Sequence, residues 1–104
     1  MIYYHVTPAS NEDSILEKGL IPQAGRNTQK AGDEEGVYLF TSYDAMKDAL
    51  SGWLLDLFDE DEYVIILQVK LPDSFEIRVN PVAEWEAICY EIIPPKFIEV
   101  IEMF

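Results

Sequence analysis

The segment from Tyr63 to Leu71, YVIILQVKL, constrains the fold of this chain more than any other. Its side chains are apolar almost without interruption, and several of them are β-branched. Such a run is typical of a β-strand, and Leu71-Pro72-Asp73 ends it because proline has no N–H to donate to a neighbouring strand. We therefore expect a strand over residues 63–71 and interpret the other segments as the elements that accompany it.

The segments before this strand predict two helices. Ser10 is a candidate N-cap for the first helix, which Gly19 ends, and Thr41 or Ser42 is a candidate N-cap for the second. The apolar residues of the second helix recur with a period near 3.6, at Met46, Ala49, Leu50, Trp53, Leu54 and Leu57. Residues 21–36 contain almost nothing apolar and predict a long surface loop between the two helices.

Further strands are predicted where short segments are rich in β-branched and aromatic residues or alternate between apolar and polar side chains. They lie at residues 2–6, 36–40, 75–80, 87–93 and 97–101. A chain of 104 residues with 49% hydrophobic residues is long enough for one core and too short for two. Because two helices are followed mostly by strands, we expect the α+β class and one small domain over residues 1–104.

The charge of the chain limits its partners. Seven Lys and Arg residues against twenty Asp and Glu residues leave a formal charge of −13, which repels a phosphate backbone. We therefore do not expect generic nucleic-acid binding; either the partners are basic or the charge mainly keeps the protein soluble. The densest acidic run, Asp59 to Glu62, predicts a solvated turn, with a surface that mimics DNA as the alternative.

No run approaches the roughly 18 apolar residues that a membrane span needs, and Met1 to Thr7 lacks the pattern of a signal peptide. We expect a cytoplasmic protein without a membrane partner. Cys89 is the only cysteine and His5 the only histidine. They permit neither an internal disulfide nor the usual combinations of zinc ligands, so we expect no metal.

The single histidine lies inside the first predicted strand, in IYYHVT. A histidine on a strand edge offers one hydrogen-bond donor and one acceptor, which suits a vicinal diol such as that of a ribose. A backbone N–H and C=O pair nearby suits a carboxamide. The alternative is a core histidine whose polar atoms are satisfied between Tyr4 and Val6.

Four motifs occur in an order that suggests a family: YHVT on the first strand, a helix ending in EKGLIP, then GVYLFTS, and finally EWEAICYEIIPP. Together they resemble the ADP-ribosyltransferase fold, in the class with a His, Tyr, Glu signature that includes diphtheria-toxin-like enzymes and poly(ADP-ribose) polymerases. The resemblance covers most of the chain at near-minimal length. It implies a split, antiparallel-rich β-sheet core with two helices.

The resemblance also implies a site for NAD as a co-substrate. His5 would hydrogen-bond ribose hydroxyls, the backbone of Val6 would hold the nicotinamide amide, and Thr7 stands where the family carries a small hydroxyl residue. The nicotinamide ring would stack on Tyr38, and Gly36 would let the backbone approach the ligand closely. For Tyr38 the alternative is a core tyrosine in a buried strand.

The third signature residue is an acid, for which the chain offers Glu84, Glu86 and Glu91. In the family the catalytic glutamate precedes a short hydrophobic strand, so Glu86 is the predicted catalytic acid. It would hold a ribose 2'-hydroxyl and stabilise the oxocarbenium-like sugar that forms as nicotinamide leaves. Glu84 would orient the acceptor, as the first acid of a Glu-x-Glu pair does in arginine-modifying toxins. The alternative for all three acids is a solvated strand edge.

The polar loop would cover the dinucleotide, and Arg26 or Lys30 could meet its diphosphate. The implied activity is cleavage of the nicotinamide–ribose bond and transfer of ADP-ribose to a macromolecular acceptor whose identity stays open; transfer to water would make the protein an NAD glycohydrolase. Two alternatives remain: a domain that binds NAD or ADP-ribose without turnover, and an acidic interaction protein such as an inhibitor or nucleic-acid mimic.

Overall fold

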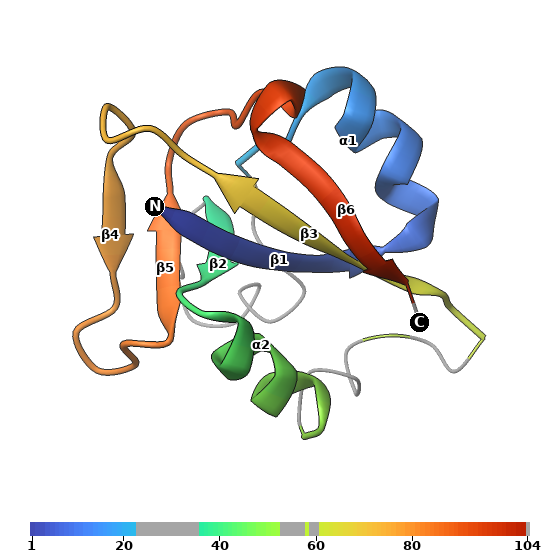
Figure 1. The fold of residues 1–104 in the computed structure, drawn as a ribbon, viewed down its shortest axis with the longest axis horizontal. Coiled ribbons are helices and arrows are strands. Elements are labelled where there is room, and N and C mark those ends of the chain that lie inside the picture. Colours follow the sequence, from blue (N-terminus) through green and yellow to red (C-terminus); the bar gives the residue numbers. More distant parts are fainter. Residues whose placement is uncertain (23–35, 53–57, 59–60, 104) are drawn as a thin grey trace.

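The structure is a computed structural model that describes residues 1–22, 36–52, 58 and 61–103. These residues form a sheet of six antiparallel strands in the order β4-β5-β2-β1-β3-β6 (Figure 1). The strands are β1 (Ile2–Pro8), β2 (Val37–Phe40), β3 (Val64–Lys70), β4 (Ile77–Val79), β5 (Glu86–Cys89) and β6 (Ile98–Met103). The helices are α1 (Glu12–Lys18) and α2 (Tyr43–Leu50), with 3-10 turns η1 (Ala9–Asn11) and η3 (Pro95–Phe97). This is the α+β arrangement expected from the sequence.

Strand β3 is the most deeply buried element of the sheet. It pairs with β1 from Ile2–Lys70 to Pro8–Val64 and with β6 on its other side. Its residues 65, 66, 67 and 69 have no exposed surface. A strand that is buried on both faces needs apolar side chains in consecutive positions, which explains the uninterrupted apolar run in its sequence.

The two helices cover opposite faces of the sheet. Alternate side chains of each strand point to opposite sides, so each face packs against its own helix. On the side that we call the α1 face, Ile15 of α1 belongs to the same buried cluster as Leu39 and Leu67. On the α2 face, Met46 of α2 packs in a second cluster with Ile66 and with Phe40. Neighbouring residues of one strand therefore serve different cores.

The backbone pairing between β1 and β2 is much shorter than that between the other neighbouring strands. Only Tyr4 and Phe40 are register partners there, whereas β2 pairs with β5 and β1 with β3 along most of their lengths. The sheet thus consists of two three-stranded halves, β4-β5-β2 and β1-β3-β6, which meet at what we call the β1–β2 junction. In Figure 1, β4 and β5 run across the direction of β1. The halves remain one hydrogen-bonded sheet.

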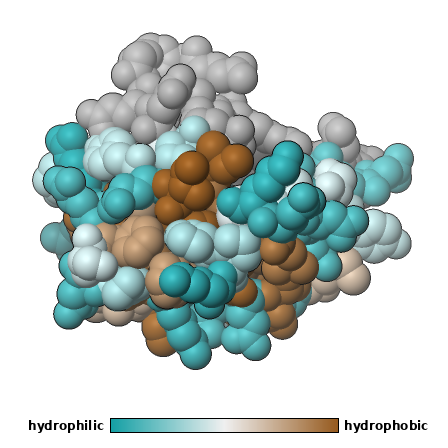
Figure 2. Space-filling model, turned by 90° about the horizontal axis from the view of Figure 1, so that it is seen from above, coloured by the Kyte–Doolittle hydropathy of each residue, from teal (hydrophilic) through white to brown (hydrophobic). Residues whose placement is uncertain are grey.

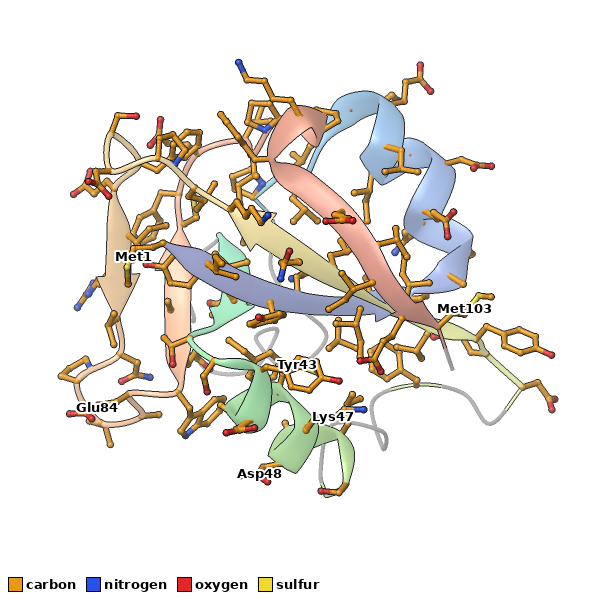
Figure 3. The ribbon with its side chains drawn as sticks, viewed as in Figure 1. Met1, Tyr43, Lys47, Asp48, Glu84 and Met103 are labelled. Carbon is orange, nitrogen blue, oxygen red and sulfur yellow. The ribbon has the colours of Figure 1, made fainter. Side chains whose placement is uncertain are left out.

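Helix α2 is fastened to the sheet by polar contacts as well as by its apolar side. The Tyr43 hydroxyl donates to one carboxylate oxygen of Glu102 on β6, and Lys47 Nζ donates to the other at 3.2 Å (Figure 3). The Tyr43 ring meets the Tyr4 ring of β1 edge to face, with 5.6 Å between ring centroids. The hydrogen bond from Tyr43, followed by that from Lys47, keeps the pKa of the Glu102 carboxyl below its ordinary value.

The helix starts were predicted with mixed success. Ser42 caps α2 as expected, since its Oγ accepts from the Ala45 N–H at 3.1 Å. Ser10 does not cap α1: it lies inside η1, and α1 begins after Asn11. The Asn11 side chain instead donates to Thr7 Oγ1 at 3.1 Å, so it ties the start of the helix back to β1.

The strand ends also differ from expectation. The strand expected over 87–93 comprises only Glu86–Cys89, and Ile93 forms a separate bridge with Leu20. The last strand begins at Ile98 because η3 occupies Pro95–Phe97. Trp53, Leu54 and Leu57, expected on the apolar side of the second helix, lie outside the described residues.

Helix α1 ends at Gly19 for two physical reasons. Gly19 has a φ of 85°, a conformation that residues with a Cβ rarely adopt. A Cβ at this position would also collide with the Ile93 carbonyl oxygen. The Leu20 N–H donates to that same oxygen at 2.9 Å, so the glycine allows the chain after α1 to join the segment after β5.

Replacing Gly19 by alanine is expected to destabilise the protein by about 1–3 kcal/mol, because both the backbone conformation and the space oppose a methyl group. Chemical denaturation followed by circular dichroism measures the change. Gly52→Ala is the matched control, since the nearest atom to its added Cβ is 3.6 Å away. Equal stability of the two variants would contradict this account of the turn.

Candidate functional site

The His5 side chain makes one hydrogen bond to the described residues, at the β1–β2 junction. Its Nδ1 lies 2.7 Å from the Tyr38 carbonyl oxygen of β2. A carbonyl oxygen only accepts, so Nδ1 carries the proton and donates. In the neutral ring Nε2 is then an acceptor. The donor that sequence analysis assigned to a ligand is therefore used by β2, and the ring keeps one acceptor rather than a donor and an acceptor.

The backbone pattern explains why the Tyr38 carbonyl is available to the imidazole. In an antiparallel ladder, alternate residues direct their N–H and C=O groups to opposite neighbours. Met1 and Ala9 bond to the β3 side, so the backbone groups of Val6 face β2. Continuing the Tyr4–Phe40 register would place Val6 opposite Tyr38, but the ladder does not extend that far. The His5 ring thus bonds the carbonyl that a regular ladder would offer to Val6.

His5 is half-buried, and its surroundings set its charge. Burial lowers the pKa of the imidazole below 6.5, and the hydrogen bond to the Tyr38 carbonyl opposes this in part. The ring is therefore neutral at pH 7. β1 is an interior strand rather than the edge expected from the sequence, although its β2 side is nearly unpaired.

Val6 and Thr7 have different surroundings. Val6 is partly buried and packs on the α2 face, with its backbone directed to the junction. Thr7 is only 6% exposed, and its hydroxyl accepts from the Asn11 side chain. Thr7 therefore has a structural partner, and the backbone of Val6 is the better placed of the two to meet a ligand.

Tyr38 and Glu86 lie on the same face of neighbouring strands. Phe40 is the register partner of Glu86 on one side and of Tyr4 on the other. Directly opposed residues share a face, and Tyr38 is two positions from Phe40, so all four side chains rise on the α2 face. Tyr38 is half-buried rather than sealed in the core. Glu86 is the first residue of β5, whereas the sequence placed the acid just before the strand.

The surroundings of Glu86 are well defined. Asn80 Nδ2 lies 3.4 Å from Glu86 Oε1 and donates to it. The preceding residue, Trp85, stacks on Phe40 with 5.9 Å between ring centroids, and its carbonyl accepts from the Thr41 N–H at 3.0 Å. The segment before β5 is thereby fixed to the end of β2.

Glu84 and Glu91 are placed less favourably. Both are exposed, and Figure 3 shows Glu84 at the outer end of the segment that joins β4 to β5. The Glu84 carbonyl accepts a hydrogen bond from the Thr41 hydroxyl at 3.0 Å, whereas its carboxylate has no hydrogen-bond partner within the described part of the chain. Glu91 Oε2 accepts from the Glu76 N–H at 3.4 Å, next to β4.

The structure places His5, Tyr38 and Glu86 on three neighbouring strands but not on one face. His5 shares a face with its register partner Leu67, which belongs to the α1 cluster, whereas Glu86 rises on the α2 face. β2 separates their strands. The His5 ring contacts β2 through the Tyr38 carbonyl, and Glu86 contacts β2 as the register partner of Phe40. A ligand that touched both side chains would have to lie across the junction.

Two other predicted positions need comment. Gly36 is buried, and a Cβ there would lie 2.5 Å from the Ile88 side chain, so close packing on β5 explains the glycine without a ligand. Arg26 and Lys30, the predicted contacts to the diphosphate, lie outside the described residues, as do Asp59 and Glu60 of the acidic run.

Sequence reasoning did not identify Asn80 or Trp85 as neighbours of the predicted acid. Both follow from the antiparallel register of β4, β5 and β2, which hydrophobic periodicity does not specify. The stretch NPVAEWE does contain Asn-Pro, a turn signal that could have suggested a tight connection back to Glu86.

Comparison with protein-family models, curated proteins and solved structures found no significant match. Within the described part of the chain, no helix has the length and apolar character needed to cross a membrane. Among the same residues, no three acidic, cysteine or histidine side chains are grouped so that they could hold a metal ion.

Acidification is expected to destabilise the protein through His5. Because burial lowers the folded-state pKa, the unfolded chain binds a proton more readily, and stability falls as the pH drops below about 6.5. NMR titration of the chain's single imidazole should give a pKa below 6.5.

The control is His5→Asn, which retains an N–H donor near the position of Nδ1 but does not titrate. Denaturation at pH 8 and pH 5 should show a smaller loss of stability for this variant than for the wild type. An imidazole pKa above 6.5, or equal losses in both proteins, would show that His5 is not desolvated at the junction.

Proposed function

We propose that this protein is a mono-ADP-ribosyltransferase that cleaves the nicotinamide–ribose bond of NAD at the β1–β2 junction. The observation that carries the proposal is the bond from His5 to the Tyr38 carbonyl, because it interrupts the ladder where two of the three signature residues occur. The order of the motifs along the sequence supports the same assignment.

The His5 and Val6 groups suit a nicotinamide riboside. Nε2 of the neutral His5 ring would accept a hydrogen bond from one ribose hydroxyl, while Nδ1 stays bonded to Tyr38. The backbone N–H and C=O of Val6, which face β2, complement a carboxamide. Tyr38 would supply the aromatic face for the pyridinium ring.

Glu86 would supply the charge for bond cleavage. As the glycosidic bond breaks, nicotinamide leaves with the bonding electron pair and positive charge develops on the ribose. A carboxylate near the 2'-hydroxyl stabilises that charge, which a neutral amide of the same shape cannot do. The hydrogen bond from Asn80 would keep the carboxylate oriented. A nucleophile of the acceptor then forms the new bond to the ribose carbon.

A second function, binding of NAD or ADP-ribose without turnover, is favoured by the opposite faces of His5 and Glu86. A pocket that uses the His5 acceptor and the Val6 backbone needs no carboxylate on the α2 face. In this case Glu86 serves as the partner of Asn80 at the start of β5.

Release of nicotinamide from NAD, measured with purified protein at high concentration in the presence of cell lysate, distinguishes the two functions. If the protein is a transferase, Glu86→Gln should lower release by about 100-fold or more and leave the fold intact. Glu99→Gln, an exposed acid on β6, is the matched control and should retain activity.

The other outcomes need one more variant, His5→Ala. If neither the wild type nor Glu86→Gln releases nicotinamide, the enzymatic function is refuted. The binding function then replaces it if NAD raises the melting temperature of the wild type and not that of His5→Ala. If NAD causes neither release nor a thermal shift, both are refuted, and an acidic interaction protein becomes the better account.

A further inference from the structure

The half of the sheet that contains Glu86 has one buried face and one partly exposed face. On the α2 face, Tyr38, Glu86 and Ile88 are only half-buried. The buried cluster that includes α2 contains Phe40 of this half but neither Tyr38 nor Ile88. On the α1 face, by contrast, the side chains of β2 and β5 belong to the other buried cluster: Val37, Leu39, Ala87 and Cys89.

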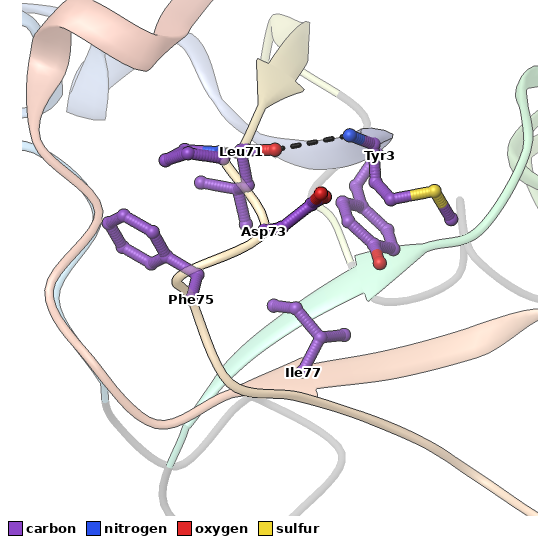
Figure 4. A pocket seen from close by; sticks show the side chains of 7 residues that line it. Tyr3, Leu71, Asp73, Phe75 and Ile77 are labelled. Atoms are coloured by element: carbon purple, nitrogen blue, oxygen red, sulfur yellow. Dashed lines mark hydrogen bonds between the residues drawn. The ribbon is translucent and has the colours of Figure 1, made fainter.

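Arg78 of β4 points to the partly exposed face. Figure 4 shows the preceding residue, Ile77, in the wall of a pocket with Tyr3, a member of the α1 cluster. Successive side chains of a strand point to opposite faces, so Arg78 lies on the α2 face. Its register partner is Ile88, which is also the partner of Tyr38. The three residues thus form one row across β4, β5 and β2.

This row places three kinds of chemistry around Ile88. Neighbouring strands lie about 4.8 Å apart, so about 10 Å separates the Cα atoms of Tyr38 and Arg78. Glu86 lies two residues from Ile88 on the same face of β5, so their Cα atoms are about 7 Å apart. An aromatic ring, a guanidinium and a carboxylate therefore border one region of the sheet. We call these four residues the β5 patch.

Arg78 supplies the positive charge of the β5 patch. It is the one basic residue in β2, β4 and β5, and it is exposed. Acids flank it on the same face, because Glu76 lies two residues before it and Glu86 lies one register row away. Arg78 has an interaction within the protein, but its guanidinium carries five N–H donors and can bind a further group.

An anionic ligand needs such a local cation on this protein. Acids outnumber basic residues by twenty to seven, and hydrophilic side chains cover much of the described surface in Figure 2. The resulting net charge of −13 repels anions at long range. Arginine overcomes this repulsion at short range, because its planar guanidinium can donate two parallel hydrogen bonds to one phosphate.

We propose that Arg78 binds the phosphate that follows the nicotinamide riboside in NAD, an inference that rests on the proposed function. In a nicotinamide nucleotide the ribose lies between the ring and the phosphate. With the ring on Tyr38 and the ribose beside Glu86, the phosphate extends across Ile88 toward Arg78. The order of the groups in the ligand then matches the order of the residues on the β5 patch. The protein therefore selects a nucleotide over the corresponding nucleoside.

NMR titration of the full chain with nicotinamide riboside and nicotinamide mononucleotide, which differ only in the phosphate, tests the proposal. The wild type should bind the nucleotide about tenfold more tightly, because the bond to Arg78 is charge-assisted. The Nε–H signal of Arg78 should shift with the nucleotide and not with the nucleoside, whereas the methyl signals of Ile88 should shift with both. Equal affinities, or an Arg78 signal that does not move, would overturn the proposal.

Three variants assign the preference to Arg78. Arg78→Gln should abolish or reverse it and leave the affinity for the nucleoside within about twofold. Arg78→Lys keeps the charge without the planar guanidinium and should give an intermediate preference. Lys70→Gln makes the same charge change at an exposed position of β3 and should retain the full preference. A preference that persists in Arg78→Gln, or that Lys70→Gln loses equally, would refute the assignment, and circular dichroism checks that each variant is folded.

The same titrations separate this proposal from the proposed function. If the nucleoside shifts the ring signals of Tyr38 but the nucleotide binds no more tightly, the NAD site stands and the role of Arg78 is refuted. If neither ligand binds at millimolar concentration and NAD causes no thermal shift, the proposed function is refuted and the role of Arg78 with it.

Discussion

The burial of β3 on both faces is the constraint on which the rest of the structure depends. A strand with no exposed surface at residues 65, 66, 67 and 69 must have a paired neighbour along each edge and a packed layer above and below. β1 and β6 provide the edges, and clusters that include α1 and α2 provide the layers. The β2 side of β1 lies outside this requirement, and β1 and β2 share a single register pair there.

The hydrogen bond from His5 to the Tyr38 carbonyl fixes how β1 and β2 lie where their backbone pairing stops. An imidazole that reaches the carbonyl of the next strand joins the two halves of the sheet by a side chain instead of by continued backbone pairing. It fixes the ring tautomer and turns one acceptor away from β2. The backbone of Val6 faces the same junction, so a local departure from regular sheet pairing brings the His5 acceptor and the Val6 backbone to one place.

The sequence predicted individual elements better than the relations between them. The apolar run of β3, the Ser42 cap and the Gly19 turn follow from local chemistry, and all three occur in the structure. The order of the strands does not follow from periodicity. For this reason sequence reasoning identified His5 and Glu86 as candidates but could not foresee that the donor of His5 is used by Tyr38, or that Asn80 reaches Glu86.

The two outer strands have a consequence for the behaviour of the protein at high concentration. An exposed edge strand can pair with the edge of another copy and begin aggregation. β4 contains only three residues, Ile77–Val79, and therefore offers a short template. β6 is longer but carries the exposed Glu99, so two such edges brought together would oppose negative charges in a chain that is already strongly acidic. The edges of the sheet thus favour a protein that stays dispersed as it accumulates.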